Sequence, residues 1–464
     1  MDKSYIVSGM MFGDEGKGSV TDYFAANSNV KYNVRHNGGS QALHSVKNGS
    51  ISHRFSQLGS AFMNEGVETY LSSNTIVNPF NLISEASFYS KEANCSIKEI
   101  MKRVFIDREA KVVTPYHSLI RKVNELSSFE IRGTTGSGIS EVQKVFDEIG
   151  ICLSMTDLLK MDSETIDKIH QLQKYTSFIF ESKINLIEKD VLKSNIDKED
   201  IENLTTDYNK DYIVNCYTNL MGSNLINIST FNNIYDGGSI VFEGSQGVMI
   251  DKDYGIKPHV TGCDTTNRFA YELSEYIKIH PISIGCIPVY TSRHGAGPLP
   301  TNSSYLNTLI FDKNQVKSYF QGVPRYGWLD LVILRYSLNI NKVDELFLTM
   351  LDRYSGINNI KVCNSYKYTG EIDDDFCKSF DYYIDGGEVI IKDIISNNNL
   401  KYYLSYIEPV YEDLKGYSFD NNVIRSVNDF PDEVFKYINY IEDKMKKKIK
   451  YLSYGPDRMQ KIRM

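Results

Sequence analysis

The sequence predicts an α/β protein: one large domain with a central, mostly parallel sheet, flanking helices and a helical insertion at about residues 153–235. Three observations support this prediction. The chain begins with an apolar strand, a glycine turn and a helix; similar short apolar runs recur after residue 239; and the segment between is polar, with apolar residues at helical spacing. No proline-, glycine- or serine-rich linker and no internal repeat divides the chain, so we expect residues 1–464 to form a single domain.

The elements follow in order along the chain. SYIVSGMMFGDEGKGSVTDYFAANSNVKYNV predicts a strand, a glycine turn, a helix and a second strand, the usual beginning of an α/β sheet. TYLSSNTIVNPFNLISEASFY continues with a strand and an amphipathic helix, and LIEKDVLKSNIDKEDIENL is typical of the helical insertion. Further on, SIVFEGSQGVMID, PISIGCIPVY and ELFLTMLD each predict a buried strand that ends at a polar loop. The tail predicts a helix, a short strand and a turn.

Composition and charge exclude several classes of function. A formal charge of −8 argues against a nucleic-acid partner, which needs a basic face. No apolar run reaches membrane length, and the first residues are too glycine-rich for a signal peptide. The seven cysteines are odd in number and lack metal-ligand spacing, which excludes a fully paired disulfide framework. We therefore expect a soluble, cytoplasmic protein that binds neither membranes nor nucleic acid.

The stretch FGDEGKGS, residues 12–19, predicts an anion site. A glycine-rich turn after a strand exposes backbone N–H groups, and the helix that follows adds its positive end. It is not an ordinary P-loop, because Met11 stands where the first glycine would be and Gly18 where a serine or threonine would be. The carboxylates of Asp14 and Glu15 would hold Mg²⁺ against phosphates, take a proton from a substrate, or merely cap the helix that begins near Lys17.

Nine short motifs in order along the chain resemble the adenylosuccinate synthetase family. They are GDEGKG, GGSQALHS, GTTGSGI, FEGSQGVMIDKDYG, PHVTGCDTTN, TSRHGAGPLPT, RYGWLD, LTMLD and SYGPDR, and they span practically the whole chain. Each motif alone is weak, but nine in the family's order are a strong signal. FSQLGS and TYLSSNTIVNPFNLI look closer to the phage-type enzymes that aminate a guanine nucleotide.

The resemblance implies a two-step ligase of purine biosynthesis. GTP, as co-substrate, would phosphorylate O6 of a 6-oxopurine nucleotide such as IMP, and the amine of L-aspartate would then displace that phosphate. Mg²⁺ would be the cofactor. The partners would be the purine nucleotide monophosphate, GTP and the amino acid, with a second copy of the chain in a homodimer.

The resemblance also assigns roles residue by residue. Asp14 would be the base at N1 and a Mg²⁺ ligand, His44 the general acid, and Lys17 the cation that neutralises phosphate charge. Gln246 would hold the purine nucleotide in the catalytic centre, and the backbone carbonyl of Leu43 would bind Mg²⁺. The implied nucleotide-binding set is Gly13, Glu15, Gly16, Gly18, Ser19, Gln41, Ser45, Thr135, Thr261, Arg325, Asp352, Ser453 and Gly455. In it, Arg325 would touch nucleotide and aspartate, and Asp352 would accept from the guanine N1 and 2-amino groups.

The sequence departs from the family pattern at residues that would recognise the substrates. Before His44, Ser40, Gln41 and Leu43 replace a histidine, an asparagine and a glycine. After GTTG the arginine that reaches a second subunit is missing, and Lys144 is the nearest cation.

The loop at 319–327 is shortened and reads YFQGVPRYG, with Val323 where an arginine belongs; Arg293 and His294 are the nearest candidates to compensate. Met350 replaces the lysine before Asp352.

Two alternatives remain open. The same chemistry would serve another acceptor, such as (d)GMP, or another amine; the phage-type enzymes are expected to carry a smaller residue at the Asp14 position, so the retained Asp14 favours an IMP-like purine. The second alternative is an inactive nucleotide-binding regulatory protein, against which the retained Asp14, Lys17, His44 and Gln246 argue. The choice between GTP and ATP also stays open.

Overall fold

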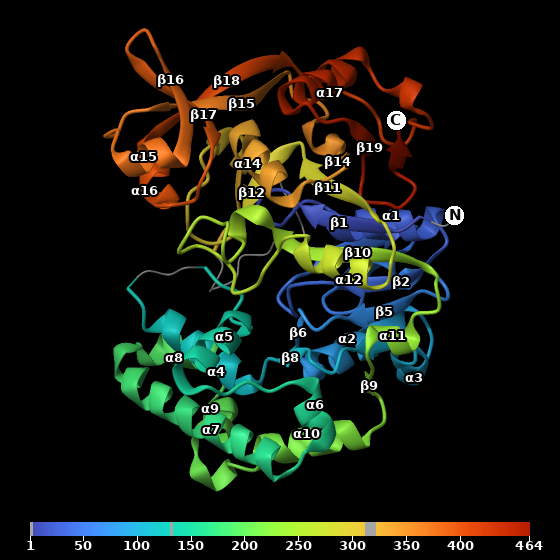
Figure 1. Cartoon of the computed structure of the whole chain (residues 1–464), viewed down its shortest axis with the longest axis vertical. Coiled ribbons are helices and arrows are strands. Elements are labelled where there is room, and N and C mark those ends of the chain that lie inside the picture. Colours follow the sequence, from blue (N-terminus) through green and yellow to red (C-terminus); the bar gives the residue numbers. More distant parts are fainter. Residues whose placement is uncertain (1–2, 130–132, 311–321) are drawn as a thin grey trace.

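A large parallel sheet forms the centre of the computed structural model, which describes residues 3–129, 133–310 and 322–464 (Figure 1). Its ten strands have the order β20-β19-β14-β11-β1-β10-β2-β5-β7-β9, and neighbours run parallel except for β19 and β20. In that order they are β20 (Lys461–Arg463), β19 (Ile449–Ser453), β14 (Glu345–Thr349), β11 (Ile282–Pro288), β1 (Tyr5–Gly9), β10 (Ser239–Gly247), β2 (Val30–Arg35), β5 (Glu68–Leu71), β7 (Val104–Ile106) and β9 (Asn227–Ile228). The predicted α/β class with a mostly parallel sheet is confirmed.

The first strand of the chain lies in the middle of this sheet. β1 pairs with β10 on one side and with β11 on the other, and all five of its residues are buried. The run YIVSG has no alternation of polar and apolar residues because both faces of a parallel sheet are covered. Helix α1 (Lys17–Asn27) follows at once and packs on β1 and β10.

A second sheet was not predicted. It has the order β12-β13-β15-β17-β16, with β18 also paired to β15, and it forms the upper part of Figure 1 together with α14 and α17. Its strands are β12 (Tyr290–Arg293), β13 (Arg325–Asp330), β15 (Asn359–Tyr368), β16 (Phe380–Asp385), β17 (Glu388–Ile394) and β18 (Ile407–Lys415). All pairs are antiparallel except β13 with β15.

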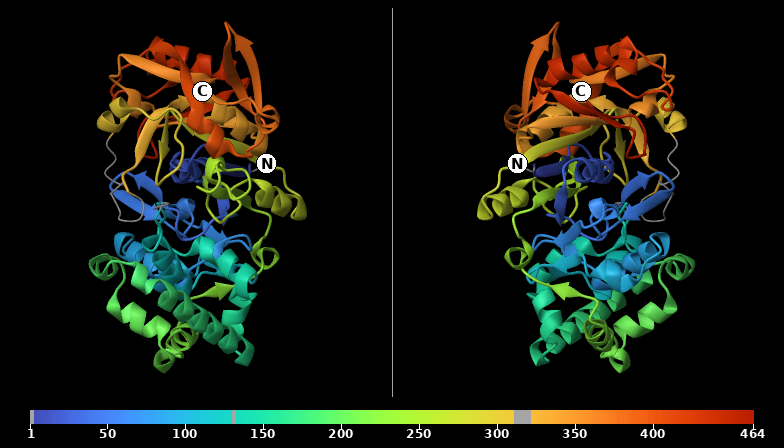
Figure 2. Two further views of the ribbon diagram at one scale, coloured as in Figure 1. Left: turned by 90° about the vertical axis from the view of Figure 1, so that its left-hand side faces the viewer. Right: turned by 90° about the vertical axis from the view of Figure 1, so that its right-hand side faces the viewer.

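Helices fill the opposite end of the molecule, as both side views show (Figure 2). They are α4 (Pro115–Leu126), α5 (Ile139–Ile149), α6 (Met155–Lys160), α7 (Ser163–Lys183), α8 (Lys189–Asn195), α9 (Lys198–Thr205) and α10 (Tyr212–Gly222). The short helix α11 (Phe231–Ile234) lies beside the central sheet, where Phe231 packs with Tyr32 and Tyr70. This helical part differs from the predicted insertion in two ways. It already includes α4 and α5, and β9 returns within residues 153–235 to pair with β7.

The remaining elements connect these parts. The helices are α2 (Pro79–Glu92), α3 (Ile97–Met101), α12 (Arg268–Tyr276), α13 (Ser304–Leu309), α14 (Leu331–Asn341), α15 (Asp374–Ser379), α16 (Leu400–Tyr403) and α17 (Asp432–Met445). Two small sheets pair β3 (His44–Asn48) with β4 (Ile51–Phe55), and β6 (Ile76–Val77) with β8 (Lys111–Val112). None of the helices in the described ranges is long and apolar enough to cross a bilayer.

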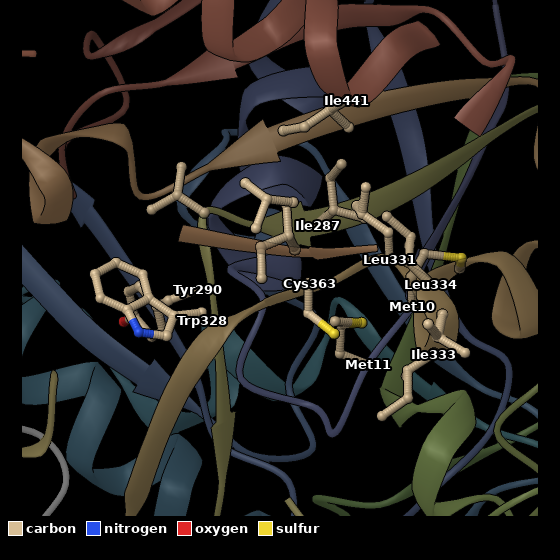
Figure 3. Close-up of a cluster of buried hydrophobic side chains, with 14 of the residues drawn as sticks. Met10, Met11, Ile287, Tyr290, Trp328, Leu331, Ile333, Leu334, Cys363 and Ile441 are labelled. Atoms are coloured by element: carbon tan, nitrogen blue, oxygen red, sulfur yellow. The ribbon is translucent and has the colours of Figure 1, made fainter. Parts of the chain in front are cut away.

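The largest apolar core joins the two sheets. Met10 and Met11 after β1, Ile287 of β11 and the apolar face of α14 meet there (Figure 3). Trp328 lies in the same core, and its ring stacks on Tyr305 with 6.1 Å between ring centres. The tryptophan therefore packs the core and fixes β13 beside the loops that follow β1 and β11. The single-domain organisation stays a prediction.

Candidate active site

The predicted site residues gather where the central strands end. Asp14 follows β1, Gln246 lies at the end of β10, Asp352 follows β14, and Ser453 ends β19. Because these strands are parallel neighbours, their carboxyl ends lie at one edge of the sheet, which is where open α/β sheets bind ligands.

The glycine loop after β1 is shaped by a buried ion pair. The carboxylate of Glu15 accepts hydrogen bonds from the backbone N–H groups of Met11 (2.6 Å) and Gly13 (3.0 Å). Lys17 Nζ lies 3.3 Å from the same carboxylate and donates to the carbonyl of Gly13 at 2.6 Å. Glu15 is buried, and burial raises its pKa. Its carboxylate therefore holds the loop in shape, and Lys17 lies at the start of α1 with its charge partly compensated.

The helix-cap interpretation of the two carboxylates is wrong. Helix α1 begins at Lys17 with Gly16 as its N-cap, at φ 77°, and no side chain in the described part of the chain caps it. Glu15 instead accepts from the backbone N–H groups of Met11 and Gly13, and a helix start without a side-chain cap attracts anions.

Asp14 contacts a second histidine. His294 Nε2 lies 2.9 Å from Asp14 Oδ2, and the Asp14 side chain is 39% exposed. Burial opposes ionisation, but the hydrogen bond and charge of His294, together with the charges of Lys17 and His44, outweigh it and lower the pKa of Asp14. Asp14 is therefore a carboxylate at neutral pH.

His44 is held by a carboxylate that the sequence interpretation did not identify. Its Nδ1 lies 2.5 Å from Glu243 Oε1, and Glu243 also accepts from the backbone N–H of Ser60 at 2.9 Å and from the Ser60 hydroxyl. Burial raises the Glu243 pKa, but the charges of Arg35 and His44 and the hydrogen bonds overcome it and hold that pKa at about 2. Since Glu243 carries no proton, His44 Nδ1 must be the donor, which leaves Nε2 as the other functional atom of the ring.

Gly18 makes this arrangement possible. A Cβ added there would lie 2.6 Å from His44 Cβ and 2.7 Å from Ser60 Oγ. Only glycine therefore allows α1 to lie so close to His44, the first residue of β3.

Two arginines fix the loop that carries His294. Arg293 is buried and donates to the carbonyls of Pro298 (2.7 Å) and His259 (3.0 Å). Arg325, its antiparallel partner between β12 and β13, donates at 2.8 Å to the carbonyls of Gly295 and Gly297. Burial lowers the pKa of both guanidinium groups. Both arginines thus brace the backbone of this loop.

Gln246 and Gln41 meet across the site. Gln41 Nε2 lies 3.4 Å from Gln246 Oε1 and 4.0 Å from the Cys263 sulfur, and Gln246 has a left-handed backbone at φ 61°. Thr261 lies two residues before Cys263, and its N–H donates to the carbonyl of Ile250 at 2.7 Å. These residues bring the ends of β10 and the 258–267 segment together.

Asp352 and the turn at 453–455 lie at the carboxyl ends of two neighbouring strands. β14 pairs with β19, and Ser453 Oγ donates to the carbonyl of Gly455 at 3.1 Å. Burial raises the pKa of Asp352.

Several other predicted site residues are exposed to solvent. Leu43 and Ser45 are exposed, and Gly13 and Ser19 are partly exposed. Thr135 Oγ1 lies 2.8 Å from Ser137 Oγ at an exposed position. Lys144 pairs with Glu141 at 2.9 Å, and Val323 is exposed. Residues 319–321 of the predicted aspartate loop lie outside the described residues.

The donor set fits Mg²⁺ that arrives with a nucleotide. Within the described ranges, no group of three or more histidine, cysteine, aspartate or glutamate side chains could hold a metal by itself. Asp14 offers one ionised carboxylate beside the helix start. Mg²⁺ is usually bound in this way, by one or two carboxylates together with substrate phosphates and water.

Comparisons with known proteins agree with this geometry. The family model for adenylosuccinate synthetase matches residues 6–462. The adenylosuccinate synthetase of Thermoplasma acidophilum is 31% identical over 479 aligned positions, which cover all of this chain and 98% of that protein.

Two solved structures share the fold. The fully ligated adenylosuccinate synthetase of Plasmodium falciparum has a TM-score of 0.78 at 21% identity, with all of both chains covered. The succinoaminodeoxyadenylate synthetase of cyanophage S-2L, bound to dGMP and to dATP as an energy donor, has a TM-score of 0.54 at 13% identity, covering all of this chain and 95% of that one. From the family match across nearly the whole chain, this protein belongs to the adenylosuccinate synthetase family and is a ligase.

Proposed function

We propose that the protein forms adenylosuccinate from IMP and L-aspartate, with GTP as the phosphate donor. The observation that carries this proposal is the pair of Asp14 and His44 beside the start of α1. Each is held by a partner, His294 and Glu243 respectively, and a proton on His44 would lower the pKa of Asp14. A base and an acid so close to an anion site suit phosphorylation of a 6-oxopurine.

The chain's own residues would act as follows. Asp14 takes the proton from N1, so that O6 becomes nucleophilic and attacks the γ-phosphorus of GTP, with GDP as leaving group. Burial lowers the pKa of His44, so the free enzyme holds a neutral imidazole. The negative charge of bound phosphates favours its protonated form, which then stabilises the charge that develops on O6.

The amine of aspartate next attacks C6, and the O6 phosphate leaves with the former carbonyl oxygen. Mg²⁺, when bound by Asp14 and the phosphates, would neutralise charge on the transferring group. Lys17 and the first backbone N–H groups of α1 would bind the same phosphates.

Arg325 would contact the aspartate. Its hydrogen bonds to Gly295 and Gly297 place its guanidinium at the loop that carries His294. With Val323 where the family has an arginine, we propose weaker binding of aspartate than is usual in the family. We also propose that the chain acts as a homodimer in the cytoplasm, as its family membership suggests.

The test is a product assay on the purified protein. It is mixed with Mg²⁺, with GTP or ATP, with IMP, GMP or dGMP, and with aspartate or a neutral amine, and products are identified by mass. The proposal requires adenylosuccinate and GDP from IMP, GTP and aspartate. If product forms only with GMP or dGMP, that nucleotide and not IMP is the acceptor. If product forms only with a neutral amine, that amine and not aspartate is the donor. Nucleotide binding without any product would indicate a regulatory protein.

A further inference from the structure

A buried lysine lies at the end of the site where Asp352 and the 453–455 turn meet. Lys461 is the first residue of β20 and lies directly opposite Ser453 in the antiparallel pair β19–β20. Its side chain comes from the last strand of the chain and is only 7% exposed. None of the roles assigned above uses this lysine.

The ammonium of Lys461 is poorly satisfied for its degree of burial. Among the described residues it donates one hydrogen bond, to the carbonyl of Asp457 at 2.8 Å, although an ammonium has three N–H donors. Burial lowers the pKa of Lys461 to about 8, even though the charges of Asp22, Asp457 and Asp352 favour the charged form. A buried ammonium with unused donors is costly unless a ligand completes its hydrogen bonds.

The nearest carboxylates are already engaged or lie farther away. Arg458 binds Asp22 with two hydrogen bonds, one of them from Nε to Oδ2 at 2.7 Å. Asp352 interacts with Lys461 through charge, and in the described part of the chain no ion pair within 4.0 Å joins them. The Asp352 side chain is 20% exposed and its Oδ2 lies 4.0 Å from Arg353 Nε, so the Lys461 ammonium and the Asp352 carboxylate act on one another through charge.

We propose that Lys461 binds O6 of the guanine of GTP, next to the N1 and 2-amino groups that Asp352 accepts. Guanine presents an acceptor, O6, beside two donors, N1–H and the 2-amino group. A lysine beside an aspartate is complementary to that pattern. Adenine presents an amino group in place of O6, and this group would face the ammonium. Lys461 would thus determine specificity for the base, which rests on the proposed use of a purine triphosphate at this site.

The test uses nucleotide analogues that change one group of the base. 6-Thioguanosine triphosphate keeps N1–H and the 2-amino group but has sulfur, a weak acceptor, in place of O6. ITP keeps O6 and lacks the 2-amino group. Binding of GTP, 6-thioguanosine triphosphate, ITP and ATP with Mg²⁺ is measured by calorimetry for the wild type, Lys461→Met and the control Lys448→Met. Lys448 precedes β19, is exposed and is paired with Glu442, so it serves as a lysine outside the proposed site.

The proposal gives a specific pattern of affinities. Wild type and Lys448→Met should bind GTP at least about fivefold more tightly than 6-thioguanosine triphosphate. Lys461→Met should lose about 10- to 100-fold in GTP affinity, the range for a hydrogen bond to a charged group. It should no longer distinguish GTP from 6-thioguanosine triphosphate, and its preference for GTP over ATP should narrow. Its preference for GTP over ITP, which reports Asp352, should remain.

Two results would overturn the inference and a third would overturn the proposed function instead. The inference is wrong if the wild type binds 6-thioguanosine triphosphate as tightly as GTP, a measurement that needs no variant. It is also wrong if the Lys461→Met variant, shown to be folded by circular dichroism, keeps the wild-type ratio of affinities for GTP and 6-thioguanosine triphosphate. If the wild type binds none of the purine triphosphates, the proposed nucleotide site itself fails.

Discussion

Replacing Glu243 by glutamine should destabilise the protein and should do so less at low pH. The buried carboxylate accepts from His44 and Ser60, and its pKa is held at about 2, against 4.5 for an ordinary glutamate. A difference of about 2.5 pKa units corresponds to about 3 kcal/mol, at about 1.4 kcal/mol per unit. Glutamine keeps the size but replaces one carboxylate oxygen by an NH2 group that faces at least one of the three donors, so most of that stabilisation should be lost at pH 7.

The sign of the pH dependence follows from the lowered pKa. The stabilisation is complete above about pH 4.5, where the unfolded glutamate is also ionised, and it is lost as pH falls toward 2. Urea unfolding followed by circular dichroism at pH 7, 5 and 3 should therefore show a gap of about 2–4 kcal/mol between wild type and variant at pH 7 and 5, and a smaller gap at pH 3.

The matched control is Glu92→Gln. Glu92 lies 2.5 Å from His53 Nδ1, but its side chain is 30% exposed, so the change should cost less. Equal stability of Glu243→Gln and wild type at pH 7, or a gap that does not shrink at pH 3, would refute the reasoning.

Three further predictions concern the site. Asp14→Asn should reduce turnover by about 10²–10⁴-fold while nucleotide affinity, measured by calorimetry, stays nearly unchanged, because the amide cannot accept the N1 proton; a variant that keeps more than about a tenth of the rate would rule out the role. Asp352→Asn should weaken the binding of GTP by about 1.5–3 kcal/mol and that of ATP much less, since only guanine offers N1–H and a 2-amino group to the carboxylate. Equal losses of affinity for both nucleotides would contradict this role. Arg325→Ala should raise the KM for aspartate by an amount worth about 2 kcal/mol or more, and should also lower kcat because its two bonds to Gly295 and Gly297 hold the His294 loop; an unchanged dependence on aspartate at saturating GTP and IMP would exclude the contact.

The parallel sheet could be predicted from the sequence, and the second sheet could not. Buried parallel strands such as YIVSG and the run before Glu243 are continuous apolar segments between glycines, which is a local signal. β18 has the sequence IEPVYEDLK, in which polar and apolar residues do not alternate strictly, and Pro409 argues against a strand. The proline is tolerated because β18 pairs on one side only, with β15. That information lies in the topology and not in the segment.

In the site, too, some residues could be predicted from local sequence and others could not. Asp14, Lys17 and His44 stand in glycine-rich motifs that are local in sequence. The partner of His44, by contrast, is 199 residues away along the chain, and no spacing connects the two. One signal was present: Glu243 is a single charge inside the apolar run SIVFEG, and a charge there requires a buried partner. Which partner it has follows only from the pairing of strands.

The central position of β1 has a consequence for synthesis of the chain. β1 ends at Gly9, whereas its neighbours β10 and β11 begin at Ser239 and Ile282. At about 5–20 residues per second, roughly 10–50 s pass before β10 leaves the ribosome. Throughout that time an apolar strand with two open edges is exposed, because the residues that will cover both edges do not yet exist. Folding of the central sheet must therefore wait for more than half of the protein, and any fragment that ends before β10 lacks both neighbours of β1.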